Sequence, residues 1–235
     1  MNTITANLTA LRAKIARACV AHGHDPHDVN LVAVSKLQPP ERIAQALAAG
    51  QRLFGENRVQ EAKAHWADLR APYPDLKLHL IGPLQTNKVS SAVALFDCIE
   101  TVDRPSLADA LAKEMKKQGR SLPCFIQVNT GEEEQKGGVA PDGLPDLLDY
   151  CRRAGLAIRG LMCIPPVDEP PGPHFALLKK LAQRHGLADL SMGMSADFEQ
   201  AIALGATYIR VGTALFGKRA ITEEKNFPRH SDRTC

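Results

Sequence analysis

The sequence lacks any apolar run that approaches the roughly 18 residues of a membrane-spanning helix, and no basic region followed by an apolar stretch opens it. Its six cysteines are scattered and form no Cys-x-x-Cys pair. Scattered cysteines in a chain of this size indicate reduced thiols, and they argue against a disulfide framework or a zinc site. We therefore expect a cytoplasmic protein that does not act at a membrane.

An excess of charge of one sign is also missing. The chain has 29 basic and 26 acidic residues, a net charge of +3, and no block of lysines and arginines. This balance argues against a nucleic-acid partner. Residues 22–28 hold three histidines and two aspartates, but such a cluster beside Gly and Pro is typical of a solvated loop. We therefore expect no metal site.

Apolar strand-like runs alternate with helix-like segments along most of the 235 residues. Such alternation predicts parallel strands joined by right-handed crossovers, and eight repeats favour a closed (β/α)8 TIM barrel. An open doubly wound sheet is the alternative, but the Gly-x-Gly-x-x-Gly that marks it is absent after the first strand. The predicted strands are 31–36, 53–55, 76–81, 95–100, 123–128, 157–162, 187–191 and 207–211. The predicted helices are 5–21, 39–49, 56–66, 104–118, 142–153, 174–185 and 196–204.

This pattern predicts a single barrel domain over residues 1–219. The helix at 5–21 is extra to the eight repeats, and we expect it to pack on the outside of the barrel. Its apolar residues follow spacings of three and four, which makes one apolar stripe. Residues 220–235 are polar and charged, as is typical of a loose tail.

Lys36 stands at the carboxyl end of the first predicted strand. Alternation places it on the same face as Val32 and Val34. An ammonium group there is partly desolvated, which lowers its pKa and favours the neutral, nucleophilic amine that Schiff-base lysines require. The alternative is a lysine that only ends a strand at the surface.

The loops after the last two predicted strands have the composition of a phosphate site. In barrels of this type, phosphate groups are often held there. Ser195 precedes the helix predicted at 196–204, where we expect it to be the N-cap. Gly212 allows close approach to a backbone N–H, and Thr213 adds a hydroxyl. The alternative is that Ser195 only caps and Gly212 only turns.

Arg210 alternates onto the same face as Tyr208 and Gly212, which would place it inside the barrel. A buried arginine needs a partner, which is either an internal acid such as Glu56 or a bound ligand. A Schiff-base lysine, a phosphate site and an inward arginine together fit pyridoxal 5′-phosphate (PLP). That cofactor has an aldehyde, a phosphate and a ring nitrogen that takes an Asp or Arg partner.

Several short motifs along the chain occur together. They lie at 33–36 (Ala-Val-Ser-Lys), 55–57 (Gly-Glu-Asn), 59–61, 79, 81–82, 84–88 (Leu-Gln-Thr-Asn-Lys), 102–104, 190–197 and 210–217. In this combination they resemble the YggS/PROSC family of pyridoxal phosphate homeostasis proteins, which looks like the barrel domain of alanine racemase standing alone. The resemblance covers residues 5–219, and it departs from the family where Leu78 takes the place of a common aromatic residue.

The resemblance implies a role for each matching residue. Lys36 would carry PLP as a Schiff base, and Arg210 would face the pyridine nitrogen. The remaining residues would hold the phosphate (Ser195, Gly212 and Thr213) or lie near the ring (Asn57, His79 and Met192). A further family motif, without a role that the residues themselves explain, matches at Asn129, Glu133, Lys136 and Gly138.

Two functions remain open: a non-catalytic PLP carrier and a PLP-dependent amino-acid racemase. An arginine stays protonated, so the ring nitrogen opposite it stays neutral and is a poorer electron sink. Racemisation also needs an acid or base on each face of the cofactor, and none of the three tyrosines (Tyr73, Tyr150 and Tyr208) is clearly placed for this. We therefore favour the carrier, as a monomer that passes PLP to apo-enzymes. A barrel enzyme that acts on a phosphorylated sugar, with Lys36 as its base, is a third possibility.

Overall fold

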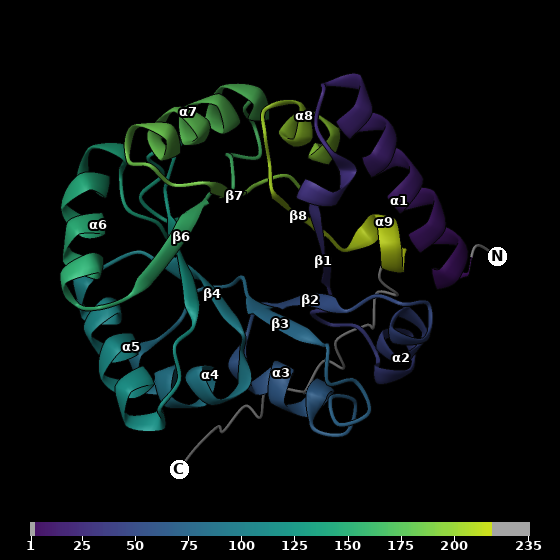
Figure 1. The fold of residues 1–235 in the computed structure, drawn as a ribbon, viewed down its shortest axis with the longest axis horizontal. Coiled ribbons are helices and arrows are strands. Elements are labelled where there is room, and N and C mark those ends of the chain that lie inside the picture. Colours follow the sequence, from purple (N-terminus) through teal and green to yellow (C-terminus); the bar gives the residue numbers. More distant parts are fainter. Residues whose placement is uncertain (1–2, 218–235) are drawn as a thin grey trace, which may run out of the picture.

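A computed structural model describes residues 3–217 and contains a closed barrel of parallel strands surrounded by helices (Figure 1). The strands follow one another around the barrel in sequence order, and β8 pairs with β1 to close it. The predicted TIM barrel is therefore confirmed, and the open sheet is wrong. The strands are β1 (Asn30–Val34), β2 (Leu53–Glu56), β3 (Lys77–Leu80), β4 (Cys98–Val102), β5 (Pro123–Gln127), β6 (Ala157–Met162), β7 (Asp189–Ser191) and β8 (Tyr208–Val211).

Helices cover the outside of the barrel (Figure 1). Their buried apolar side chains belong to the same core cluster as apolar side chains of the strands. Helix α5 illustrates the local signals: Pro105 occupies its first turn, Leu107 and Leu111 lie on the buried face, and Gly119 ends it with φ of 62°. The helices are α1 (Ile4–Ala21), α2 (Pro40–Ala48), α3 (Val59–Trp66), α4 (Val89–Leu95), α5 (Pro105–Gln118), α6 (Leu144–Arg153), α7 (Pro171–Arg184), α8 (Phe198–Ala203) and α9 (Thr213–Phe216). Short 3₁₀ turns lie at Pro26–Asp28, Thr86–Lys88 and Pro141–Gly143.

Helix α1 is the element extra to the barrel repeat. The Thr3 hydroxyl accepts a hydrogen bond from the Ala6 N–H and caps the helix. Leu8, Leu11 and Ile15 form its buried stripe, which packs against α2, α8 and α9. This confirms the apolar face predicted for 5–21. The tail predicted at 220–235 lies outside the described residues.

Two predicted boundaries near the second and fourth strands are wrong. Leu95 ends helix α4 and does not open a strand, because Val89 and Val93 lie one turn apart on the buried face of that helix. The fourth strand therefore begins later, at Cys98. Glu56 belongs to β2 and not to the following helix, because its backbone continues the pairing with β3. Helix α4 itself was not predicted.

The barrel interior contains an apolar layer and a polar layer. Cys98, Phe125, Met162 and Tyr208 form a small apolar cluster, separate from the larger core between strands and helices. The Tyr208 ring lies 5.5 Å from the ring of Phe125, nearly perpendicular to it. The polar side chains Glu100, Ser191 and Arg210, which come from the neighbouring positions of β4, β7 and β8, are buried as well.

Candidate functional site

Lys36 lies two residues after β1, beyond the end of that strand and not inside it as the predicted range 31–36 had it, and it is half-buried. The residues on either side of it are held from β2 and α3. The Ser35 hydroxyl donates to Glu56 Oε1 at 2.7 Å, and the Leu37 N–H donates to Glu61 Oε1. Leu37 has φ of 58°, a left-handed conformation that is uncommon for leucine. Two carboxylates therefore fix the turn that presents Lys36.

A cavity of about 260 Å³ opens where β1, β7 and β8 end. This volume lies just below the usual range for small-molecule sites, about 300–1,000 Å³. Five residues predicted from the sequence line it: Lys36, Ser195, Arg210, Gly212 and Thr213. The structure therefore brings an amine, two hydroxyls, a glycine backbone and a guanidinium together in one pocket.

Ser195 holds the loop after β7 against helix α9. Its hydroxyl accepts a hydrogen bond from the Ala214 N–H at 3.3 Å. The prediction that Ser195 caps the next helix is wrong: α8 begins at Phe198, Asp197 occupies the N-cap position, and the Asp197 carboxylate accepts from the Met194 N–H at 2.5 Å. The loop therefore runs further before α8 starts, which leaves Ser195 at the pocket wall.

Gly212 is not required by the protein's own backbone or packing. Its φ of −111° suits any residue, and an added Cβ would meet Val34 at 3.5 Å, an ordinary van der Waals contact. Gly193 differs, because its φ is 90° and a Cβ would lie 2.5 Å from Ala201. Since both Gly212 and Val34 line the pocket, the missing side chain keeps space open for a ligand.

Arg210 is buried and projects into the barrel interior. Its Nη1 donates to Ser191 Oγ at 2.6 Å, and its Nη2 donates to the Cys163 carbonyl at 2.7 Å. The suggested pairing with Glu56 is wrong, because Glu56 Oε1 accepts from Ser35 and from the α3 side chains of His65 and Trp66.

Glu100 lies beside Arg210 in the polar layer and is fully buried. Burial alone raises the pKa of its carboxyl, but the hydrogen bond from His79, the charges of His79 and Arg210, and the hydrogen bond from Ser191 together lower that pKa. Glu100 is therefore an ionised acid at neutral pH, in a site from which water is excluded.

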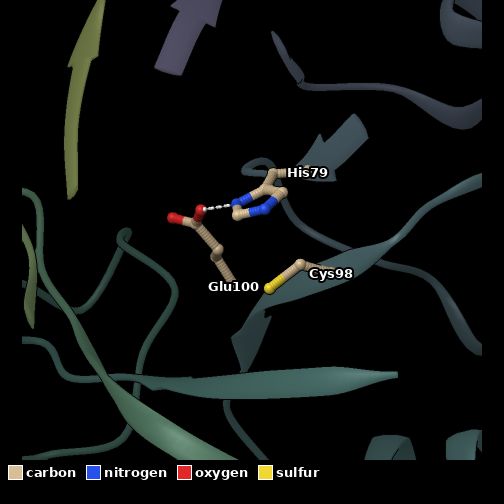
Figure 2. A group of neighbouring side chains, drawn as sticks. All are labelled: His79, Cys98 and Glu100. Carbon is tan, nitrogen blue, oxygen red and sulfur yellow. Dashed lines mark hydrogen bonds and ion pairs between the residues drawn. The ribbon is translucent and has the colours of Figure 1, made fainter. Parts of the chain in front are cut away.

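His79 projects from β3 toward Glu100 on β4, and Cys98 lies below them (Figure 2). His79 Nδ1 lies 2.6 Å from Glu100 Oε1. Burial, followed by the charge of Glu100, raises the pKa of the Cys98 thiol well above its usual value. The three groups are close enough to bind a metal ion, but a thiol kept protonated is a poor ligand. His79 is accordingly a hydrogen-bond partner of Glu100 at the edge of the polar layer.

Three predicted residues, Asn57, His79 and Met192, do not line the pocket described above. Asn57 follows β2, and its Oδ1 is buried without a hydrogen-bond partner among residues 3–217. It faces a neighbouring cavity of about 530 Å³. Met192 is fully buried in the core, and Met194 lines the pocket in its place. The predicted positions of Asn57, His79 and Met192 near a bound ring remain predictions.

The motif at 129–138 closes the loop after β5. The Asn129 side chain donates to the Glu133 carbonyl at 2.8 Å and accepts from the Glu133 N–H at 3.3 Å. Lys136 pairs with Glu133 at 2.6 Å and donates to the Pro165 carbonyl after β6 at 3.3 Å. Gly138 has φ of 121°, and a Cβ there would lie 2.7 Å from the Asn129 nitrogen. These residues therefore tie two rim loops together.

Sequence reasoning missed Glu100, Ser191 and Glu61 as site residues. Glu100 offered a signal, because an acid that ends a strand predicted to be buried, at 95–100, must have a buried partner. Ser191 and Glu61 offered none, since a serine at a strand end and a glutamate on a helix are ordinary.

The fold and the pocket define a class of protein: a parallel barrel with a lysine after its first strand and a polar pocket across its last two. The family model described as "Alanine racemase, N-terminal domain" matches residues 6–220. The pyridoxal phosphate homeostasis protein of Pseudomonas aeruginosa is 43% identical over 225 residues, covering 93% of this chain and 97% of the relative. That of Escherichia coli K12 is 38% identical over 231 residues, with 93% and 98% covered. The chain belongs to the family of pyridoxal phosphate homeostasis proteins.

Solved structures give the same result. PipY of Synechococcus elongatus superposes with a TM-score of 0.81 without PLP and 0.79 with PLP bound, at 41% and 40% identity; each match covers 92% of this chain and 100% of PipY. An alanine racemase of Clostridium difficile has a TM-score of 0.72 at 13% identity and shows the shared fold alone, since the match covers 57% of that enzyme. None of the helices within residues 3–217 is long and apolar enough to cross a membrane.

Proposed function

We propose that this protein binds pyridoxal 5′-phosphate and serves intracellular PLP homeostasis, holding PLP as a Schiff base on Lys36. The cited relatives, which match more than nine-tenths of this chain, carry this name, and PipY has been solved with PLP bound. The observation that carries the proposal is the single pocket lined by Lys36, Ser195, Arg210, Gly212 and Thr213. These donors match the aldehyde, phosphate and ring nitrogen of PLP.

The residues of the pocket fit PLP one group at a time. The Lys36 amine would condense with the aldehyde, forming one C=N bond and releasing one water. The hydroxyls of Ser195 and Thr213, with the backbone beside Gly212, would hold the phosphate. Arg210 would donate to the ring nitrogen. We propose that Asn57, His79 and Met192 lie near the ring.

The surroundings of the pocket support a carrier over a racemase. An arginine opposite the ring nitrogen keeps that nitrogen unprotonated, which weakens the cofactor as an electron sink. In the described part of the chain, no tyrosine lines the pocket to serve the second face. Tyr208 packs against Phe125 inside the barrel, and Tyr150 donates to Asp109 on the outer helices. Burial, followed by nearby acids, raises the pKa of Tyr208 to about 12.

We further propose that the barrel acts as one domain over residues 1–219, in the cytoplasm and as a monomer. PLP held by a single covalent bond can be released by hydrolysis, so apo-enzymes that need PLP are the proposed acceptors. Without a strong electron sink or a second acid–base group, the bound cofactor remains intact until it leaves.

The test is covalent labelling. The protein is incubated with PLP, reduced with borohydride and mapped by mass spectrometry. The label is expected on Lys36, and Lys36→Ala should lose both the label and the absorbance of the bound cofactor while keeping its circular dichroism spectrum. Lys113→Ala, which removes an exposed lysine on α5, is the matched control and should label normally. A label elsewhere would overturn the assignment of Lys36. Racemisation of alanine by the pure protein at an enzymatic rate would overturn the carrier.

A further inference from the structure

A continuous chain of hydrogen bonds crosses the barrel interior beneath the pocket. It runs from His79 on β3 to Glu100 on β4, then to Ser191 on β7 and Arg210 on β8. The three links measure 2.6 Å each. Arg210 is the one member of this chain that also lines the pocket, so the chain ends at the site proposed for the ring nitrogen.

The direction of each bond at Ser191 follows from its single hydroxyl proton. That proton goes to Glu100 Oε2, because an ionised carboxylate can only accept. The Ser191 oxygen is therefore left with lone pairs alone, and it accepts from Arg210 Nη1. The second guanidinium nitrogen, Nη2, donates to the Cys163 carbonyl at 2.7 Å. Two anchors on different nitrogens fix both the position and the plane of the guanidinium.

Burial and the opposite charges of Glu100 and Arg210 strengthen the hydrogen bonds that hold the Arg210 guanidinium. Glu100 and Ser191 are fully buried, and Arg210 is 4% exposed, so water does not replace a broken bond. The Glu100 carboxylate is the negative group that the buried guanidinium requires. Ser191 links the two, because its hydroxyl donates to Glu100 and accepts from Arg210. Removing the hydroxyl leaves the Arg210 donor and the Glu100 acceptor buried without the partner that they share, which is costly in a region of low dielectric.

We propose, on the basis of the function proposed above, that Ser191 and Glu100 are positioning residues that fix the Arg210 guanidinium for the ring nitrogen of PLP. Ser191 is the direct link, and Glu100 orients its hydroxyl. Neither touches the cofactor; both act through Arg210. The consequence is specific: loss of the Ser191 hydroxyl should matter to PLP only when both Arg210 and the ring nitrogen are present.

The test uses Ser191→Thr and Ser191→Val, a pair of equal shape that differs in one hydroxyl. Both add the same bulk to a buried position, so packing effects cancel in the comparison. Relative to Thr, Val is expected to raise the dissociation constant of PLP about tenfold or more. In Ser191→Val, the absorbance of the bound cofactor should shift in the same direction as in Arg210→Gln, and borohydride should still label Lys36. If Ser191→Val does not fold, Ser191→Ala against wild type makes the same comparison.

Two further comparisons separate positioning from a structural role. In an Arg210→Gln background, the Thr-to-Val difference should fall below about twofold, because the group through which Ser191 acts is gone. The difference should also disappear with a PLP analogue whose ring nitrogen is replaced by C–H. A difference that persists in either comparison, or no difference with PLP itself, would overturn the proposal.

Failure of the proposed function looks different. It would appear in the wild-type protein, as no borohydride label on Lys36 and no bound-cofactor absorbance. Wild-type labelling on Lys36, with equal affinities and spectra for the Thr and Val variants, overturns the positioning proposal and leaves the proposed function standing. Glu100→Gln, which keeps the shape but removes the charge, should change the spectrum in the same direction as Ser191→Val; an unchanged spectrum would overturn the role of Glu100.

Discussion

Replacing Glu56 by glutamine should destabilise the protein in a manner that depends on pH. The Glu56 side chain is fully buried, and its Oε1 accepts from Ser35 at 2.7 Å, from His65 at 2.9 Å and from Trp66 at 3.1 Å. Its Oε2 is buried without a hydrogen-bond partner among the described residues. The glutamine side chain has the same shape and can place its oxygen at the Oε1 position. Its NH₂ group then lies at the Oε2 position, where the described residues offer it no acceptor.

The magnitude follows from the three bonds. A neutral acceptor weakens each bond by roughly 1 kcal/mol compared with a charged one. The loss for three bonds therefore approaches about 3 kcal/mol, and the smaller cost of burying a neutral amide recovers part of it. We expect Glu56→Gln to lower the free energy of unfolding by about 2 kcal/mol at pH 6.

The pH dependence comes from His65. Its pKa is raised, chiefly by the side-chain hydrogen bond to Glu56, against an opposing contribution from burial. Because the folded pKa lies above the unfolded value of about 6.5, this contribution is fully present below pH 6.5 and is lost as pH rises through the folded pKa. The protonated ring is the form that the carboxylate binds more strongly, and it is absent at high pH. The difference between wild type and Glu56→Gln should therefore shrink from pH 6 to pH 9.

Urea unfolding, followed by Trp66 fluorescence at half-unit steps of pH, measures both the loss of unfolding free energy and its dependence on pH. The natural control is His65→Asn, which keeps a polar donor without a titrating ring and should flatten the same pH dependence. Parallel stability curves for wild type and Glu56→Gln across this range, or a loss below about 0.5 kcal/mol, would refute the reasoning.

Three further outcomes are expected. Gly160→Ala should abolish or severely weaken folding, because a Cβ would lie 2.0 Å from the Asp189 carbonyl across the β6–β7 pair; normal thermal unfolding of this variant would contradict that contact. Leu37→Asn should stabilise the protein by up to about 1 kcal/mol in denaturant titrations, since asparagine tolerates the left-handed region better than leucine; a loss of stability would show that the exposed leucine contributes contacts. Native protein at pH 8 should resist iodoacetamide at its five described cysteines, and mapping by mass spectrometry should find rapid alkylation there only after unfolding. Burial raises the thiol pKa to about 12 at Cys124 and Cys163 and to about 11 at Cys151, which keeps these thiols protonated at pH 8.

Much of the fold was accessible from the sequence because its signals are local. Alternating strand and helix patterns predicted the closed barrel, and the ends of α5 coincide with a proline in its first turn and a glycine directly after it. The predicted boundary was wrong where a local pattern is compatible with both a helix and a strand. The apolar run before Cys98 suits either a helix face or a strand, and packing of Val89 and Val93 decided for the helix.

The site residues also differ in how far the sequence predicted them. Lys36, Gly212 and Thr213 were predicted because each follows a strand, and in a parallel barrel the carboxyl ends of all strands meet at one rim. The N-cap assigned to Ser195 was wrong, because its partner is Ala214 on the next unit of the barrel. A capping pattern in sequence does not reveal a competing partner brought close by the fold.

The sequence by itself determined that eight strands would close into a barrel and that an amine would stand at its rim, because both follow from residue periodicity over short distances. Only the tertiary structure decided the partners of Arg210. Glu100 and Ser191 are 91 residues apart in the chain, yet their side chains bond at 2.6 Å. Closure and tilt of the barrel set which inward residues share a layer, and no local pattern encodes that choice, so Arg210 meets Ser191 rather than Glu56.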